Sequence, residues 1–398
     1  MTTSFDYLIV GGGMVADAAA RGIRERDPKG SIGILSEDMD EPYARPALTK
    51  KLWTDPSFSW DKTTLHTARD TGAEIHLETT VRSLDPAAHS ATSTSGEKFE
   101  YGRLLIATGG HPKEIDLPEN DDRVIYFRSA NDYRRLRDFA DAHAHVGVIG
   151  GGYIGTELAA ALVQNGASVT LIFPDDVLGG TVFPRELAEK FQKQFTDAGV
   201  KLRANSTVQT GSGGADAITL TLKDGSTLDV DAVVSGLGIE PAIQIADAAG
   251  IAVDDGILVD ERLRTSAPDV FAAGDVASYP DAILGRRRVE HVDNAKEMGA
   301  AAGRIMAGDD SPYDYTPYYY SVVFDSSYEA VGTLDASLNV IEDWAVPLRS
   351  GVLYYLDGSE TRGVLLWNVS GKRDAARKVL SRAEPASRDE LVGAIPVS

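Results

Sequence analysis

Two stretches of the chain repeat the same order of apolar, glycine-rich and alanine-rich positions. Residues 7–20 read YLIVGGGMVADAAA, and residues 146–159 read VGVIGGGYIGTELA. In each stretch the short apolar run predicts a buried strand, the glycine cluster a tight turn, and the alanine-rich part a helix. A second apolar run follows each helix, at residues 31–36 and 168–173. Strand, turn, helix and parallel strand form a βαβ unit, so the pattern predicts two such units.

Later apolar runs complete each half of this repeat. Residues 104–110 (LLIATGG) predict a strand that returns to the first unit, and residues 233–238 (VVSGLG) predict the equivalent strand of the second. Between them, residues 217–230 alternate between apolar and polar positions around Asp224 and Gly225. An Asp-Gly pair between alternating runs predicts a β-hairpin.

The pattern changes after Pro312, where no further glycine motif occurs. Strands are predicted at residues 321–334, 340–346, 352–356 and 363–369, followed by a closing helix at residues 373–382. The predicted fold class is therefore α/β, with two Rossmann-like dinucleotide-binding domains and a C-terminal α+β domain. The predicted boundaries are residues 1–113 with 236–312 for the first domain, 114–235 for the second, and 313–398 for the third.

The first glycine cluster fits the dinucleotide-binding pattern G-x-G-x-x-G/A through Gly11, Gly13 and Ala16. The glycines permit a tight turn and a close approach of the backbone to a pyrophosphate, and the alanine lets the helix pack on the strand. The pyrophosphate is then favoured by the exposed N–H groups and the dipole of the helix N-terminus. Glu37 follows the second strand, where an acid can accept a hydrogen bond from a ribose hydroxyl.

The second glycine cluster matches the full pattern through Gly150, Gly152 and Gly155. Asp175 and Asp176 follow its second strand, and the first arginine after that strand is Arg185. Acids accept the ribose hydroxyls of NAD and repel the 2′-phosphate of NADP. The pattern therefore predicts NADH over NADPH, the alternative being that the two aspartates only form a solvated loop.

Composition and charge narrow the function further. The chain of 398 residues has 39 Lys and Arg against 60 Asp and Glu, a net charge of −21, which disfavours polyanionic partners such as nucleic acid. It has no cysteine, which excludes disulfides, thiolate metal sites and redox-active thiols. We expect no metal site. No run of about 18 apolar residues predicts a transmembrane segment, and we expect a cytoplasmic location.

A third signature lies at residues 265–277 (TSAPDVFAAGDVA), an apolar run that ends in Gly274 and Asp275. It resembles an element of the flavoprotein reductases with two dinucleotide-binding domains, in which the aspartate binds the ribityl and phosphate part of FAD. The resemblance implies that the first βαβ unit binds FAD and that the second binds the nicotinamide dinucleotide.

The chain has no cysteine, and it resembles the cysteine-free branch of these flavoprotein reductases. That branch contains the ferredoxin, putidaredoxin and rubredoxin reductases and the apoptosis-inducing-factor-like flavoproteins. The likeness extends over nearly the whole chain, and residues 171–176 and 316–332 are most similar to the apoptosis-inducing-factor-like subgroup. Four local matches carry it: residues 42–50 (PYARPALTK), 155–157 (GTE), 287–295 (RRVEHVDNA) and 363–376 (GVLLWNVSGKRDAA).

The resemblance implies roles for individual residues. It places Arg45 and Lys50 near the flavin, and it implies that Glu157 pairs with Lys50, so these last two are the catalytic candidates. Where ferredoxin reductases often carry a tryptophan-containing PWFWS-like run, this chain reads PYYYS, with Tyr320 as the candidate for stacking on the flavin. The candidate FAD-binding residues are Gly11, Gly13, Ala16, Glu37, Arg45, Lys50, Thr108, Gly109, Gly274, Asp275, Glu290, His291 and Tyr320. The candidate NAD-binding residues are Gly150, Gly152, Tyr153, Ile154, Gly155, Glu157, Asp175, Gly236 and Gly238.

The resemblance implies an FAD-dependent NADH oxidoreductase that passes electrons to a ferredoxin- or rubredoxin-type protein. Two alternatives stay open: an NADH oxidase or quinone reductase that resembles apoptosis-inducing factor, and an NADH-sensing protein that is reoxidised slowly. Acidic ferredoxins would need a basic patch on this acidic chain. Residues 286–288 and Arg134, Arg135 and Arg137 are candidates for such a patch, unless they are ordinary solvated charges. A homodimer is the candidate oligomeric state.

Overall fold

The computed structural model describes residues 2–382 and 387–397. Residues 383–386 and 398, which fall in the predicted third domain, and residue 1 lie outside the described part. The chain divides into two compact units. Unit 1 comprises Met1–Pro46, Ser59–His111 and Glu240–Pro317, and unit 2 comprises Ala47–Phe58, Pro112–Ile239 and Tyr318–Ser398. Within the described ranges, no helix has the length and apolar character needed to cross a membrane.

Unit 1 is built on a largely parallel sheet, with strand order β3-β2-β1-β6-β5-β4 and with β19 paired to β6. The helix α1 (Met14–Arg26) connects β1 to its parallel neighbour β2, which confirms the first predicted βαβ unit. The strands are β1 (Thr2–Val10), β2 (Ile32–Leu35), β3 (Glu74–His76), β4 (Val81–Asp85), β5 (Ser90–Ser93), β6 (Lys98–Ile106) and β19 (Val270–Ala272). Only β4 and β5 run antiparallel to their neighbours among these strands. The carboxyl ends of β1, β2, β6 and β19 therefore meet at one edge, where α1 begins.

A second, smaller sheet and three helices complete the main elements of unit 1. The sheet has the order β17-β18-β20-β21. Its strands are β17 (Val253–Asp254), β18 (Gly256–Leu258), β20 (Ala277–Asp281) and β21 (Gly285–Arg287), and the helices are α3 (Thr67–Thr71), α7 (Gln244–Ala248) and α8 (Val292–Met306).

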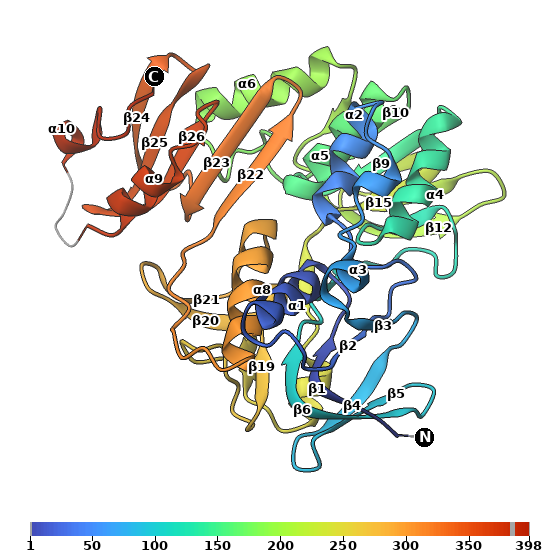
Figure 1. The fold of residues 1–398 in the computed structure, drawn as a ribbon. Helices are drawn as coiled ribbons and strands as arrows, with labels where there is room; N and C mark the ends of the chain where they lie inside the picture. Colours follow the sequence, from blue (N-terminus) through green and yellow to red (C-terminus); the bar gives the residue numbers. More distant parts are fainter. Residues whose placement is uncertain (1, 383–386, 398) are drawn as a thin grey trace. The chain divides into compact units, whose positions relative to one another are not determined.

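The helices α1 and α8 lie side by side at unusually close range (Figure 1). A Cβ atom added to Gly303 of α8 would lie 2.1 Å from the carbonyl oxygen of Ala19, and one added to Gly22 of α1 would lie 2.2 Å from that of Ala300. Backbone therefore contacts backbone between the two helices. This contact depends on glycine at both positions.

Unit 2 contains the second βαβ unit, in a parallel sheet with strand order β11-β10-β9-β15-β8. Its strands are β8 (Val124–Tyr126), β9 (His145–Ile149), β10 (Ser168–Ile172), β11 (Lys201–Arg203) and β15 (Ala232–Ser235), and its helices are α4 (Ala130–Asp141), α5 (Tyr153–Gln164) and α6 (Arg185–Asp197). An antiparallel meander of β12 (Val208–Gly213), β13 (Ile218–Leu222) and β14 (Thr227–Val230) packs its apolar residues against this sheet. The hairpin predicted at Asp224 and Gly225 joins β13 to β14.

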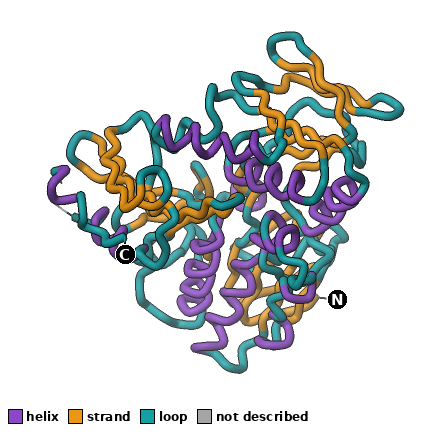
Figure 2. Tube along the Cα trace, turned by 90° about the horizontal axis from the view of Figure 1, so that it is seen from above, coloured by secondary structure: helices purple, strands orange, loops and turns teal. Residues whose placement is uncertain are grey.

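The last part of unit 2 is an antiparallel sheet with strand order β22-β23-β26-β25-β24, whose strands lie near the C-terminus marked in Figure 2. Its elements are β22 (Tyr318–Val323), β23 (Ser326–Gly332), β24 (Asn339–Val346), β25 (Ser350–Asp357), β26 (Glu360–Trp367), α9 (Arg373–Leu380) and α10 (Arg388–Leu391). The prediction of one strand over residues 321–334 was wrong. The chain reverses at Phe324, which has a positive φ of 50°, so β22 and β23 form a hairpin there.

The short segment Ala47–Phe58 packs within unit 2, although the predicted first domain included it. Its helix α2 (Lys51–Thr54) carries the buried Trp53, whose carbonyl oxygen accepts a hydrogen bond of 3.2 Å from the amide of Asn165. The ring of Trp53 also contacts that of Tyr133 edge-on, with 5.3 Å between the centroids. The three-domain boundaries stay a prediction.

We expect Gly303→Ala to destabilise the protein, because the new methyl group would overlap the carbonyl of Ala19. Overpacking of this kind costs about 1–3 kcal/mol, enough to outweigh the better helix propensity of alanine. Thermal or urea unfolding would measure the loss. Lys296→Ala, at an exposed position of the same helix, is the control and should leave stability nearly unchanged. Equal unfolding free energies of Gly303→Ala and the wild type would show that α1 and α8 can move apart at this contact without loss of stability.

Candidate functional site

The turn after β1 has the backbone geometry that a pyrophosphate site needs. Gly11 has a φ of +117°, and a Cβ atom there would lie 2.2 Å from the carbonyl oxygen of Ala107. Gly13 is the N-cap of α1 and provides no side-chain cap, and Ala16 is fully buried. The side chain of the N-cap residue therefore does not cap the first N–H groups of α1. Binding of a phosphate group at a helix N-terminus requires such uncapped N–H groups.

Other predicted FAD-binding residues surround this turn within unit 1. A Cβ atom on Gly13 would have a guanidinium nitrogen of Arg45 at 3.8 Å, so the sequence-distant arginine lies beside the glycine turn. A Cβ atom on Gly274 would lie 2.4 Å from a methyl carbon of Val15, which places the Gly274–Asp275 element against the start of α1. Glu37 is exposed just beyond the end of β2. These positions fit FAD.

The remaining predicted residues of unit 1 have defined partners in the chain. The hydroxyl of Thr108 donates to the carbonyl of Ala242 at 2.9 Å, and the carbonyl of Gly109 accepts from the Ala242 N–H at 3.0 Å. His291 is the N-cap of α8, where its ring nitrogen accepts from the Asp293 N–H at 3.5 Å. Glu290 pairs with Arg288. His291 thus caps the N-terminus of α8.

The second glycine turn repeats this geometry in unit 2. Gly150 has a φ of +108°, and a Cβ atom there would lie 2.7 Å from the carbonyl oxygen of Gly236. Gly152 is the N-cap of α5 without a side-chain cap, and a Cβ atom on it would meet nothing within 4 Å. Gly155 packs against the carbonyl of Gly150, and the carbonyl of Gly238 accepts from the Lys113 N–H at 2.9 Å. The open turn fits a second dinucleotide.

Tyr153 and Ile154 begin α5 beside this turn, and each is 39% exposed. The ring of Tyr153 packs edge-on against Tyr319, with 5.6 Å between the ring centroids, and against Tyr328 at 6.0 Å. Burial of the hydroxyl raises the pKa of Tyr153 to about 12. The ring contacts with Tyr319 and Tyr328 give Tyr153 a packing role at the start of α5.

The acidic loop after β10 contains Asp175, which is partly buried, and Asp176, which is exposed. The carboxylate of Asp176 forms an ion pair with the guanidinium of Arg185. This contact lowers the pKa of Asp176 and raises that of Arg185. Arg185 is therefore next to the acidic loop in space, in an ion pair whose two side chains are each 59% exposed.

Glu157, in the second turn of α5, is the centre of a buried polar cluster in unit 2. The residue is only 3% exposed. One carboxylate oxygen accepts hydrogen bonds of 2.6 Å from both the ammonium of Lys50 and the hydroxyl of Thr49. The other oxygen accepts a hydrogen bond of 2.6 Å from the hydroxyl of Ser321. The structure thus brings together the two catalytic candidates that the resemblance implied.

Tyr320 joins this cluster through its ring, because the ammonium of Lys50 lies 5.2 Å from the ring centroid. Such a cation–π contact adds to the stabilisation of a partly desolvated lysine. Burial is the main cause of the raised pKa of Tyr320, and the nearby charge of Glu157 adds to it. The predicted stacking of Tyr320 on a flavin stays a prediction.

Thr49 and Ser321 are the members of the cluster that sequence reasoning missed. Thr49 immediately precedes Lys50 in the PYARPALTK match, and Ser321 ends the PYYYS run. Their position inside these matches was the only available signal. A hydroxyl aimed at a carboxylate that lies 108 or 164 residues away cannot be recognised from the local pattern.

At least four of the six arginines proposed for a basic patch have partners within the described part of the chain. Arg288 pairs with Asp255 and Glu290, and Arg286 donates to the carbonyls of Val259 and Ser278. Arg135 donates to carbonyls at residues 122 and 124, and Arg137 pairs with Asp141. These arginines are bound to their own chain, as expected for ordinary structural charges.

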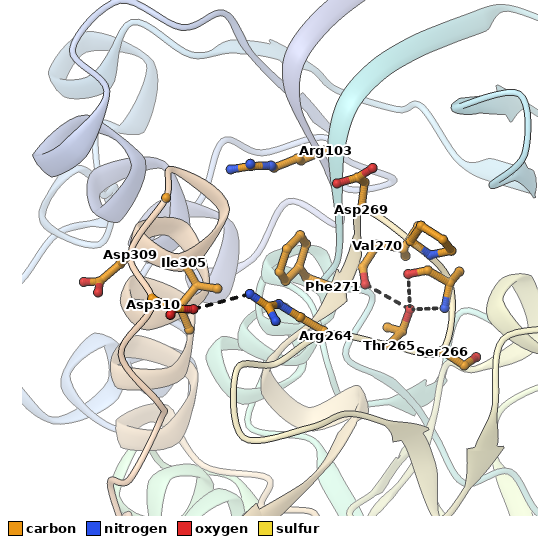
Figure 3. Close-up of a pocket in the computed structure, with 13 residues that line it drawn as sticks. Arg103, Arg264, Thr265, Ser266, Asp269, Val270, Phe271, Ile305, Asp309 and Asp310 are labelled. Atoms are coloured by element: carbon orange, nitrogen blue, oxygen red, sulfur yellow. Dashed lines mark hydrogen bonds and ion pairs between the residues drawn. The ribbon is translucent and has the colours of Figure 1, made fainter.

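A separate pocket of about 510 Å³ lies in unit 1, away from the glycine turns. It contains Arg103, near the middle of β6, and the loop that precedes β19 (Figure 3). Figure 3 shows Arg264 directed toward Asp310, with 3.6 Å between the charged atoms. Dinucleotides bind at the carboxyl ends of parallel strands, and this pocket lies at the amino end of β19. It is therefore not the cofactor site.

Comparison with known proteins identifies relatives along the whole chain. Apoptosis-inducing factor 1, mitochondrial, from Dictyostelium discoideum is 30% identical, covering 94% of this chain and 78% of the relative. Monodehydroascorbate reductase from Pisum sativum is 31% identical, covering 98% and 96%. The crystal structure of a ferredoxin reductase from Rhodopseudomonas palustris matches with a TM-score of 0.87 and 27% identity, covering 97% and 96%.

The profile of the pyridine nucleotide-disulphide oxidoreductases matches residues 5–299, which include both glycine turns. This match confirms the expected FAD and nicotinamide cofactors, although the chain lacks the cysteines that the family name suggests. The chain therefore belongs to the pyridine nucleotide-disulphide oxidoreductase family and is an FAD-dependent NAD(P)H oxidoreductase.

Proposed function

We propose that this protein is an NADH-dependent electron-transfer reductase that delivers electrons to a small iron–sulfur or rubredoxin-type protein. The observation that carries the proposal is the buried cluster around Glu157, placed on the helix that begins at the second glycine turn. When bound, FAD supplies the redox chemistry, by accepting a hydride from the nicotinamide and releasing electrons to an acceptor. The chain binds and orients the reactants.

The buried ion pair supports a functional role for Lys50 and Glu157. Moving both charges out of water costs more than an apolar pair would, so such a pair is weak evidence for a contribution to stability. Buried charge pairs also occur in structural networks, so the place of this pair on the helix that begins at the second glycine turn is what favours a functional role. We infer that Glu157 holds the Lys50 ammonium in one place, where its charge assists reduction of the flavin.

The preference for NADH rests on the acidic loop after β10. Asp175 can accept hydrogen bonds from ribose hydroxyls, and the two aspartates repel a 2′-phosphate. Equal kcat/KM values for NADH and NADPH would contradict this part of the proposal.

Different observations support different classes of electron acceptor. The likeness to a ferredoxin reductase structure favours an iron–sulfur protein. The net charge of −21 and the internally paired arginines favour a second candidate, a small uncharged acceptor such as a quinone or O₂. A sensing protein would instead hold its reduced state and change its oligomeric state, with a homodimer as the candidate form.

Stopped-flow absorbance would test the acceptor. The protein is first reduced with NADH without oxygen and then mixed with a ferredoxin, a rubredoxin, a quinone or O₂. We expect reoxidation by an iron–sulfur protein or rubredoxin to be fastest at equal concentration. Faster reoxidation by the quinone or O₂ would select the oxidase function. Slow reoxidation by every acceptor, with an NADH-dependent change in elution volume on a sizing column, would select the sensor.

Lys50→Ala should lower the rate of flavin reduction by NADH roughly tenfold or more, because a positioned charge is lost. The visible flavin spectrum should show that FAD stays bound. Lys51→Ala is the matched control, since Lys51 is exposed and its ammonium lies over the ring of Phe58 at 5.5 Å. A Lys50→Ala protein that is reduced as fast as the control would remove Lys50 from the mechanism.

A further inference from the structure

The choice between the two nicotinamide dinucleotides involves a residue that is not itself expected to touch NADH. This inference rests on the proposed NADH site after β10. Arg185, the first residue of α6, lies in the same part of unit 2 as the acidic loop, because its guanidinium contacts the carboxylate of Asp176. In NADP sites, an arginine near the end of the second strand accommodates the 2′-phosphate.

Two carboxylates form ion pairs with this arginine. Asp176 contacts one terminal nitrogen of the guanidinium, and Glu189 accepts a hydrogen bond of 2.6 Å from the Nε atom. One positive and two negative charges leave this group of three side chains with a net charge of −1. The N–H donors of Arg185 that would bind a phosphate bidentately are thus partly used by these two carboxylates. The net negative charge of the three side chains also repels an anion.

We propose that Asp176 is a specificity-determining residue that keeps this site selective for NADH by holding Arg185. Asp175 then accepts hydrogen bonds from the ribose hydroxyls, and Asp176 holds Arg185 in an ion pair. When the charge of Asp176 is removed, only the charges of Arg185 and Glu189 remain, and these cancel. The guanidinium nitrogen that contacted Asp176 then has no carboxylate partner. The site would then accept a 2′-phosphate through a residue that the chain already contains.

Equilibrium binding tests this without flavin chemistry. Isothermal titration calorimetry on the purified flavoprotein would compare ADP-ribose with its 2′-phosphorylated form, using the wild type, Asp176→Asn and Asp176→Asn/Arg185→Ala. We expect Asp176→Asn to bind the phosphorylated probe about fivefold to tenfold more tightly, because a charge-assisted contact replaces repulsion. Its affinity for ADP-ribose should be little changed, and Arg185→Ala in the same background should cancel the gain.

Asp197→Asn provides the matched control. Asp197 pairs with Lys193 at 2.6 Å on the same helix and is similarly exposed, so this variant makes the same change of charge away from the acidic loop. It should leave both affinities unchanged. The inference is overturned if Asp176→Asn does not change the ratio of the two affinities, or if its gain survives the loss of Arg185. A wild type that binds neither probe would instead overturn the proposed NADH site and this inference with it.

Discussion

The carboxylate of Glu157 is the constraint on which the organisation of unit 2 depends. A buried carboxylate needs several donors, and this one receives them from Thr49 and Lys50 in one segment and from Ser321 in another. Loss of one partner of a buried pair typically costs about 3–5 kcal/mol, because the remaining charge stays desolvated. The segments must therefore stay in place together, or the cluster is lost.

This arrangement links the cofactor turn to the last sheet. Glu157 lies on α5, which begins at the uncapped glycine turn, and Ser321 lies on β22 of the C-terminal sheet. Tyr153 makes a second link, because its ring packs on Tyr319 and Tyr328 of the same sheet. The helix that is expected to bind the nicotinamide dinucleotide is thus held at its N-terminal half by residues from β22 and β23. The C-terminal region contributes polar and aromatic contacts to this part of unit 2 even though it carries no glycine motif.

Sequence reasoning succeeded where the signal is local. The glycine turns, their flanking strands and helices, and the Asp224–Gly225 hairpin follow from spacing and backbone requirements that act within about 30 residues. It failed where the determinant is a long-range contact. The reversal at Phe324 has no glycine, asparagine or proline at the turning residue, so residues 321–334 resembled one strand. Long-range contacts also place Ala47–Phe58 in unit 2, where Trp53 contacts residues 80 or more positions away, and the predicted three-domain boundaries stay a prediction.

A double-mutant cycle measures whether Lys50 and Glu157 act as one unit in flavin reduction. The rate of anaerobic flavin reduction by NADH would be measured for the wild type, Lys50→Ala, Glu157→Ala and the double variant, with bound FAD verified from the visible spectrum. We expect each single variant to be slowed and the double variant to be little slower than either, because each change already removes the pair. Additive effects on the logarithm of the rate, or no effect of either change, would contradict this expectation.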